Sequence, residues 1–402
     1  MKSKIKILKF SGDRVVWLLC FILSTISLIA VYSSIGYTAI IDYHTTPVMA
    51  FLKKHLLYVL IAYLGAMVVS NINYQFFSRI ANVLYLGAVA LLFVVLVLGG
   101  RWLRLRYIGQ FQPSEIAKPI VIIFIAHLLA IYHDQLNDKK LFWLTLIPLA
   151  LVAGLIMPEN LSTALLVFAT GLAIMYLGGV KRKYIFITIA LLGIAGGSML
   201  FVSYKVFHSP LASYAREAPL IARAETWSNR IDHWLNPDKE ELSQENMARM
   251  AIAEGGLIKA NIGGTVHARL MTQANNDFIY AIIVEETGSI VGVIIFLLYT
   301  ILFYRCMILA YKSGRRFGGL LIMGIATSIY LQAIVHICVC VGVIPVTGQT
   351  LPLISTGGTS YVFTCIGIGM IQAVVKSSNN QRKLQKNDEA AIDDKTTTEE
   401  TK

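Results

Sequence analysis

The sequence predicts an all-α polytopic membrane protein with about ten transmembrane helices and a large extracytoplasmic loop between helices 7 and 8. Of its 402 residues, 56% are hydrophobic and only 14% are charged, and the mean hydropathy is +0.65. Soluble domains carry about 25% charged residues, so this composition excludes a soluble protein. Ten apolar runs approach the ~20 residues that cross a bilayer. They lie at 15–36, 55–71, 80–100, 115–132, 141–157, 161–179, 184–204, 278–304, 317–342 and 361–376.

Basic residues predict the orientation of these helices. They gather in the N-terminal tail at 1–14, in alternate connections such as Lys181-Arg182-Lys183, and in the C-terminal tail. If the ten helices cross the membrane one after another from the N-terminus, all of these segments fall on the same side of it. The positive-inside rule identifies that side as cytoplasmic. Both termini are therefore expected in the cytoplasm, and no cleavable signal peptide is predicted. The net charge of +12 then reflects topology, so no nucleic-acid partner is expected.

Three segments stand apart from the helices of the predicted transmembrane domain at 15–376. The outer loop at 205–276 contains aromatic and cationic residues, which predict packing on the membrane face. The segment 343–358 is apolar and rich in Gly and Pro, and such backbone is tolerated at membrane depth only inside protein or beside a wet cavity. The tail at 377–402 has low complexity and is predicted to be a disordered cytoplasmic extension. The five cysteines have no zinc-site spacing and are interpreted as apolar side chains.

Asp277 is the main candidate for chemistry. It lies where the long polar loop meets an apolar helix, and Glu285 and Glu286 follow about two turns later. Ionisable groups at the hydrocarbon usually pair or serve function. A carboxylate at the membrane rim can take a proton from a lipid-carried substrate, whereas the alternative interpretation is a helix N-cap. The two glutamates are expected to be structural.

The outer connection at 99–115 holds arginines on the side where arginine is depleted. Arg101, Arg104 and Arg106 fit either snorkelling to lipid phosphates or binding of an anionic group. Trp102 is either an interfacial anchor or a surface on which a sugar stacks. Glu115 and Lys118 are three residues apart, so they are expected to pair on one helix face. Glu159 is expected to be an exposed carboxylate in a turn.

Four segments in order resemble the SEDS family, which includes FtsW, RodA and SpoVE. Gly100-Arg101-Trp102 followed by Phe111–Lys118 is similar to its R-W and F-Q-P-S-E-x-x-K signature. Arg230–Pro237 resembles the outer-loop R-x-x-x-[FW]-L-[DN]-P element. Asp277–Gly288 is similar to D-F-I-[FY]…E-E-x-G, and Pro345–Ser360 to P-V-T-G-x-x-L-P-[FL]-[IV]-S-x-G-G-[ST]-S. The resemblance covers about 15–376.

The chain departs from the family pattern in several loops. Pro158-Glu159-Asn160 stands where P-D-x-G is usual, Lys259-Ala260-Asn261 replaces G-x-G, and Asn275-Asn276 replaces the commoner H-T. Thr356 occupies a position where Tyr or Arg is frequent. These differences concern loop conformation more than chemistry.

The resemblance implies a peptidoglycan glycosyltransferase that polymerises lipid II at the outer face of the bacterial cytoplasmic membrane, with Asp277 as general base. The implied substrate-binding residues are Arg101, Trp102, Arg104, Glu115, Lys118, Thr347, Gly348, Ser355, Gly357 and Gly358. No residue is assigned as a metal ligand, although a divalent cation (Mg²⁺ or Mn²⁺) would suit the pyrophosphate leaving group.

The implied partners are a class B penicillin-binding protein and other membrane proteins of the divisome. The amino-acid sequence at Pro345–Thr350 and the charged tail are more like those of FtsW, the division member of the family, than those of RodA. The protein is therefore expected at the division septum. The alternatives are an elongation polymerase of the RodA type, a lipid II flippase or a scaffold. The chain has no internal repeat of the kind found in many transporters.

Overall fold

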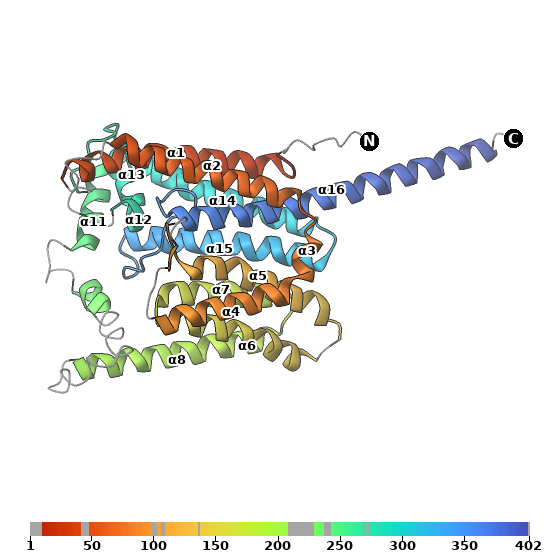
Figure 1. Ribbon diagram of the computed structural model, residues 1–402, viewed down its shortest axis with the longest axis horizontal. Helices are drawn as coiled ribbons and strands as arrows, with labels where there is room; N and C mark the ends of the chain where they lie inside the picture. Colours follow the sequence, from red (N-terminus) through yellow and green to blue (C-terminus); the bar gives the residue numbers. More distant parts are fainter. Residues whose placement is uncertain are drawn as a thin grey trace.

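The computed structural model describes residues 10–41, 48–98, 103–105, 109–135, 137–207, 229–236, 243–267, 271 and 274–400. Long helices lie side by side in a bundle (Figure 1). Their bounds are α1 Arg14–Ile41, α2 Val48–Asn71, α4 Ala81–Leu98, α5 Pro113–Tyr132, α6 Asp138–Ile156, α7 Leu161–Leu177, α8 Arg182–Phe207, α14 Ser289–Tyr311, α15 Arg316–Cys340 and α16 Gly358–Glu400. The short helices are α3 Gln75–Arg79, α11 Gln244–Gly255, α12 Ala274–Asp277 and α13 Ile279–Thr287.

The helical membrane fold is confirmed. Within the described residues, eight helices are long and apolar enough to cross a bilayer, namely α1, α2, α4, α5, α6, α14, α15 and α16. The apolar helix α7 has 17 residues, and α8 has 26. These ten helices match the ten predicted runs, while the number of membrane crossings and the side of each loop stay predictions.

The predicted run at 278–304 is not one helix but two. Gly288 separates α13 from α14 with a φ of +90°, a conformation that side chains with a Cβ rarely adopt. A Cβ on Gly288 would lie 2.5 Å from the carbonyl oxygen of Leu257, so only glycine allows this loop to pass. The loop carbonyls of Gly256 and Leu257 accept the first N–H groups of α14, from Ser289 and Ile290. Hydropathy cannot reveal this break, because both helices are apolar.

One element departs from the all-helical prediction. The strands β1 (Leu103–Leu105) and β2 (Gly109–Phe111) form an antiparallel pair in which Leu103 faces Phe111 and Arg104 faces Gln110. The Leu-Arg-Leu alternation suits a strand with two different faces. This hairpin leads directly into α5 and its Glu115–Lys118 pair.

The centre of the bundle is formed by α5, α15 and α16. In each of them 67% of the apolar window is buried, against 28% in α2 and α4. Close packing between α2 and α16 depends on small residues, since a Cβ on Gly369 would lie 2.6 Å from the carbonyl oxygen of Ala66. Small residues that let backbones approach are the usual contact between membrane helices.

Polar contacts join the start of α1 to α14 and α16 at one end of the bundle. Asp13 receives two hydrogen bonds from Arg305 of α14, with 3.2 Å to Nε and 2.6 Å to the terminal nitrogen. The backbone of Asp13 also exchanges hydrogen bonds with the side chain of Gln372 in α16. Burial opposes ionisation of Asp13, but Arg305 and the N–H groups of Val16 and Val15 together lower its pKa. The start of α1 is therefore held by charge as well as by packing.

The C-terminal tail differs from the predicted disorder. Helix α16 continues without a break to Glu400 and projects beyond the bundle (Figure 1). After Gly369 this segment contains neither Gly nor Pro, and it is rich in Lys, Gln, Glu and Ala, which favour helix. A polar composition therefore does not by itself predict disorder here.

Candidate functional site

Asp277 lies at the end of α12, directly before the bend that leads into α13. The N-cap of α13 is Phe278, so the interpretation of Asp277 as that cap is wrong. Phe278 is 1% exposed, whereas Asp277 is half-buried. The side chain before the bend is thus partly accessible, while Phe278 at the bend is fixed in the core.

The Gly- and Pro-rich segment at 343–357 is fastened to the residue that precedes Asp277. Ser355 donates its hydroxyl to the carbonyl oxygen of Asn276 at 2.8 Å, and Thr356 donates to the Asn276 side chain at 2.5 Å. A Cβ built on Gly348 would lie 3.6 Å from Oδ2 of Asp277. Residues about 70–80 positions apart in the chain therefore form one wall around the carboxylate.

Buried polar side chains of α15 and α7 form hydrogen bonds with the same segment. Gln332 of α15 donates to the carbonyl oxygen of Thr350 at 2.8 Å. The ring Nδ1–H of His336, also in α15, donates to the carbonyl oxygen of Gln349 at 2.8 Å, and the Gln349 side chain donates to Thr163 of α7 at 2.8 Å. Irregular backbone inside a membrane protein needs such partners because lipid supplies none.

The predicted pair between Glu115 and Lys118 is present. Their charged atoms are 2.7 Å apart, and their side chains are 11% and 7% exposed. Lys118 also donates to Oε1 of Gln332 at 3.2 Å. The pair on α5 is therefore connected through Gln332 to Thr350 in the segment beside Asp277.

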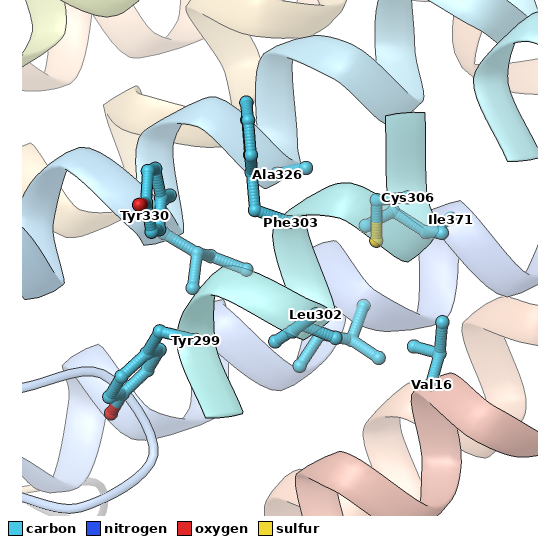
Figure 2. Close-up of a pocket in the computed structure, with 10 residues that line it drawn as sticks. Val16, Tyr299, Leu302, Phe303, Cys306, Ala326, Tyr330 and Ile371 are labelled. Atoms are coloured by element: carbon cyan, nitrogen blue, oxygen red, sulfur yellow. The ribbon is translucent and has the colours of Figure 1, made fainter. Parts of the chain in front are cut away.

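Among the described residues, two cavities lie in the bundle next to side chains that bind the 343–357 segment. The larger, of about 40 Å³, is lined at its polar end by Glu115, Lys118 and Gln332 and otherwise mainly by apolar residues of α5, α15 and α16. The smaller, of about 10 Å³, has an apolar lining that includes Tyr299 (Figure 2). The Tyr299 hydroxyl donates to the carbonyl oxygen of Pro352. The smaller cavity has room for about one water, so it is a packing gap.

The described parts of the loop at 205–276 pack on the C-terminal end of α15 and the start of the 343–357 segment. Arg230 donates to the carbonyl oxygen of Val346 at 3.1 Å, and the Trp234 indole donates to Gly342 at 2.9 Å. Glu245 of α11 accepts from the N–H of Val346 at 3.4 Å. Burial raises the pKa of Glu245, against this hydrogen bond and nearby positive charges. Residues Arg230, Trp234 and Glu245 of this loop are thus packed against the helical bundle, while its position on the membrane face stays a prediction.

Glu285 and Glu286 of α13 bind the loop at 263–267. Glu286 accepts from the hydroxyl of Ser33 and from the N–H of Gly263, and Glu285 accepts from the N–H groups of Val266 and His267. Both glutamates are buried. Where the chain is described, one group of potential metal-binding side chains has its donor atoms within 4.8 Å of one another, and it consists of Glu254, His267 and Glu285.

The remaining predicted residues are distributed as follows. Thr347 precedes Gly348 and is half-buried. Gly357 directly precedes α16 and lies close to Thr350, and Gly358 begins α16 and lies close to Tyr58. Arg101, Trp102 and Arg106 lie outside the described residues, and of Arg104 only the backbone in β1 is described. Glu159, expected to be exposed, is half-buried in the turn between α6 and α7.

Sequence reasoning missed the residues that support the wall. Gln332 and His336 are polar residues inside an apolar helix, which is a signal for a buried interaction. Their partners at Thr350 and Gln349 follow only from the folded backbone.

Comparisons with known proteins identify the family. A family model described as "Cell cycle protein" (FTSW_RODA_SPOVE) matches residues 13–380. "Probable peptidoglycan glycosyltransferase FtsW" of Geobacter sp. (strain M18) is 29% identical over 370 residues, which cover 89% of this chain and 95% of that protein. "Stage V sporulation protein E" of Bacillus subtilis (strain 168) is 27% identical over 385 residues, covering 92% and 98%.

Solved structures share the fold. A chain from "Structural coordination of polymerization and crosslinking by a peptidoglycan synthase complex" has a TM-score of 0.69 and 23% identity, covering 92% of this chain and 99% of that one. The "Rod shape determining protein RodA" of Thermus thermophilus has a TM-score of 0.63 and 21% identity, covering 91% and 97%. With a family model matching most of its length, this chain belongs to the FtsW/RodA/SpoVE family.

Proposed function

We propose that this chain is a peptidoglycan glycosyltransferase that polymerises lipid II, with Asp277 as the general base. The observation that carries the proposal is the position of Asp277: a half-buried carboxylate at a bend, beside Gly348 and the 343–357 wall. Relatives named as peptidoglycan glycosyltransferases support the same reaction class.

The reaction needs one base. The acceptor sugar's 4-hydroxyl attacks the donor's anomeric carbon, a new C–O bond forms, and Asp277 takes the hydroxyl proton. The bond from the anomeric carbon to the pyrophosphate oxygen breaks, and its electron pair leaves with the pyrophosphate. Because that leaving group needs no protonation, a second carboxylic acid of the kind used in ordinary glycoside hydrolysis is unnecessary.

Negative charge develops on the pyrophosphate leaving group, and nearby cations would stabilise it. Arg101 and Arg104 of the connection at 99–115 would hold the diphosphate, and Trp102 would contact a sugar. Glu115 and Lys118 would support the cavity wall through Gln332 rather than contact the reacting atoms, since their contacts run to Thr350. Thr347, Gly348, Ser355, Gly357 and Gly358 would shape the wall itself.

The expected setting is septal cell-wall synthesis in the bacterial cytoplasmic membrane, with both termini in the cytoplasm. A class B penicillin-binding protein would cross-link the product. The structural relative described as a synthase complex for polymerization and crosslinking supports such a partner. Other divisome proteins would recruit the pair, and RodA-like relatives keep an elongation role as the alternative.

The test is polymerisation of lipid II by the purified full-length chain, alone and with its penicillin-binding partner. We expect Asp277→Asn to lower the rate by roughly 10²–10⁴-fold, the usual contribution of a general base. Asp138→Asn is the matched control, because Asp138 pairs with Lys181 far from this wall. Normal polymerisation by Asp277→Asn would reject the base. Transport of lipid II without polymerisation by the wild type would favour a flippase.

A further inference from the structure

Glu254, His267 and Glu285 meet where the loop after α11 folds over α13. His267 Nδ1 lies 3.2 Å from Oε2 of Glu254 and 3.2 Å from Oε1 of Glu285. The three residues come from different segments, α11, the 256–267 loop and α13. We propose that they bind a divalent transition-metal ion, Mn²⁺ or Zn²⁺, which fastens this loop to α13.

The two distances from His267 Nδ1 to the carboxylate oxygens fit a shared ion. Metal–ligand bonds of about 2.0–2.2 Å at tetrahedral or octahedral angles place neighbouring ligand atoms roughly 2.8–3.6 Å apart. The two measured separations of 3.2 Å fall in that range. A neutral imidazole has at most one proton on Nδ1, so it serves two carboxylates poorly by hydrogen bonding. As a metal ligand it needs no proton there.

Glu285 supplies the second, independent observation. Its side chain is 1% exposed, and its Oε1 faces His267, which places the carboxylate inside the cluster. Its other oxygen, Oε2, is buried and has no hydrogen-bond partner among the residues that the structure describes. Buried carboxylate oxygens are normally paired or bound to a metal. A cation bound by both oxygens of the Glu285 carboxylate would satisfy it.

The cluster is accessible to solvent on the Glu254 side and carries a net negative charge. The side chains of Glu254 and His267 are 45% and 16% exposed, so an ion and a water ligand can enter. Lys259 lies 3.4 Å from Oε1 of Glu254 and leaves Oε2 for the site. With neutral histidine, the two glutamates and the lysine sum to one negative charge.

The donor set selects the kind of cation. One imidazole nitrogen with carboxylate oxygens suits Zn²⁺ and Mn²⁺. Mg²⁺ and Ca²⁺ prefer oxygen ligands alone. Glu285 lies about two turns into α13, beyond the bend at Phe278 that separates this helix from Asp277, and Asp277 is not a member of the cluster, so the proposed ion is structural and does not rest on the proposed reaction.

The test measures binding and thermal unfolding of the full-length protein in detergent after treatment with EDTA and dialysis. Mn²⁺, Zn²⁺, Mg²⁺ and Ca²⁺ are titrated separately, with calorimetry and, for Mn²⁺, electron paramagnetic resonance. We expect one Mn²⁺ or Zn²⁺ per chain and a Tm increase of a few degrees at saturating ion, with weaker effects of Mg²⁺ and Ca²⁺.

Three variants make the result specific. His267→Gln and Glu254→Gln should each weaken Mn²⁺ and Zn²⁺ binding by at least about tenfold, and Glu254→Gln keeps the test valid if the histidine variant fails to fold. His133→Gln, at a histidine between α5 and α6, should bind like the wild type. A wild-type protein whose Tm does not respond to any of the four ions overturns the proposal. So does a loss of binding that is equal in His133→Gln.

Discussion

Lys118 of α5 donates to the side chain of Gln332 in α15 at 3.2 Å, and Gln332 in turn donates to the backbone of Thr350. The Glu115–Lys118 ion pair is therefore connected by two successive hydrogen bonds to the 343–357 segment beside Asp277. The amide of Gln332 can serve both partners because it offers one acceptor and one donor group. The pair therefore affects both stability and the shape of the cavity wall.

Removing one member of this pair should destabilise the protein strongly. Glu115→Gln or Lys118→Met is expected to cost about 3–5 kcal/mol, since each leaves an uncompensated buried charge. The double variant should lose less than the sum of the two. A double-mutant cycle by denaturation in detergent measures the coupling, and strictly additive losses would contradict it.

Gly348→Ala should impair polymerisation far more than folding. Gly348 has a φ of +63°, and alanine there costs about 1 kcal/mol of strain while placing a methyl group 3.6 Å from the Asp277 carboxylate. A wall displaced by even 1 Å is expected to lower the rate roughly 10–100-fold.

Gly314→Ala is the control for that substitution. Gly314 has a similar φ of +71°, but a Cβ there would meet no atom within 4 Å. It should lose comparable stability and keep normal activity. Equal loss of activity in the two variants would mean that backbone strain alone, and not proximity to Asp277, explains the effect.

Asp13 should make stability depend on pH in acid. Its folded-state pKa is lowered, so its stabilising effect is fully present above its ordinary value of 3.8 and is lost as the pH falls through the folded pKa. Asp13→Asn keeps an N-cap side chain for Val15 and Val16 but removes the charge facing Arg305. Thermal unfolding between about pH 2 and pH 5 should show a shallower acid slope in Asp13→Asn. An unchanged slope would show that other carboxylates control acid unfolding.

Hydropathy was sufficient to predict the helical fold, because each long helix is also a long apolar run. It failed at Gly288, where two apolar helices meet, and in the tail, where polar residues with high helix propensity continue α16. The position of Asp277 could be predicted from the loop boundary and the family resemblance. Its contact with the wall could not, since Asn276 and Ser355 meet only through the packing of α12 against the end of α15 and the segment after it.

Polar residues in apolar helices predict buried interactions, but they do not identify the partners. Gln332 and His336 indicate buried partners by their type, but nothing in the sequence says that these partners are backbone carbonyls of Thr350 and Gln349. The same holds for His267 and Glu285, whose side chains meet through a turn of the chain that the residue pattern does not specify.

Arginine at position 101 should be required for its shape as well as for its charge. The residue precedes β1 in the chain, in a connection that the positive-inside rule predicts to lie on the side where positive charge is disfavoured. A guanidinium group can bridge two phosphate oxygens, whereas lysine offers a point charge. If Arg101 holds the diphosphate of lipid II, Arg101→Lys should weaken polymerisation and Arg101→Ala should weaken it further. Snorkelling to bulk lipid predicts instead that lysine substitutes freely. Rates measured over a range of lipid II concentrations separate the two, and unchanged kinetics in Arg101→Lys would leave only the membrane anchor.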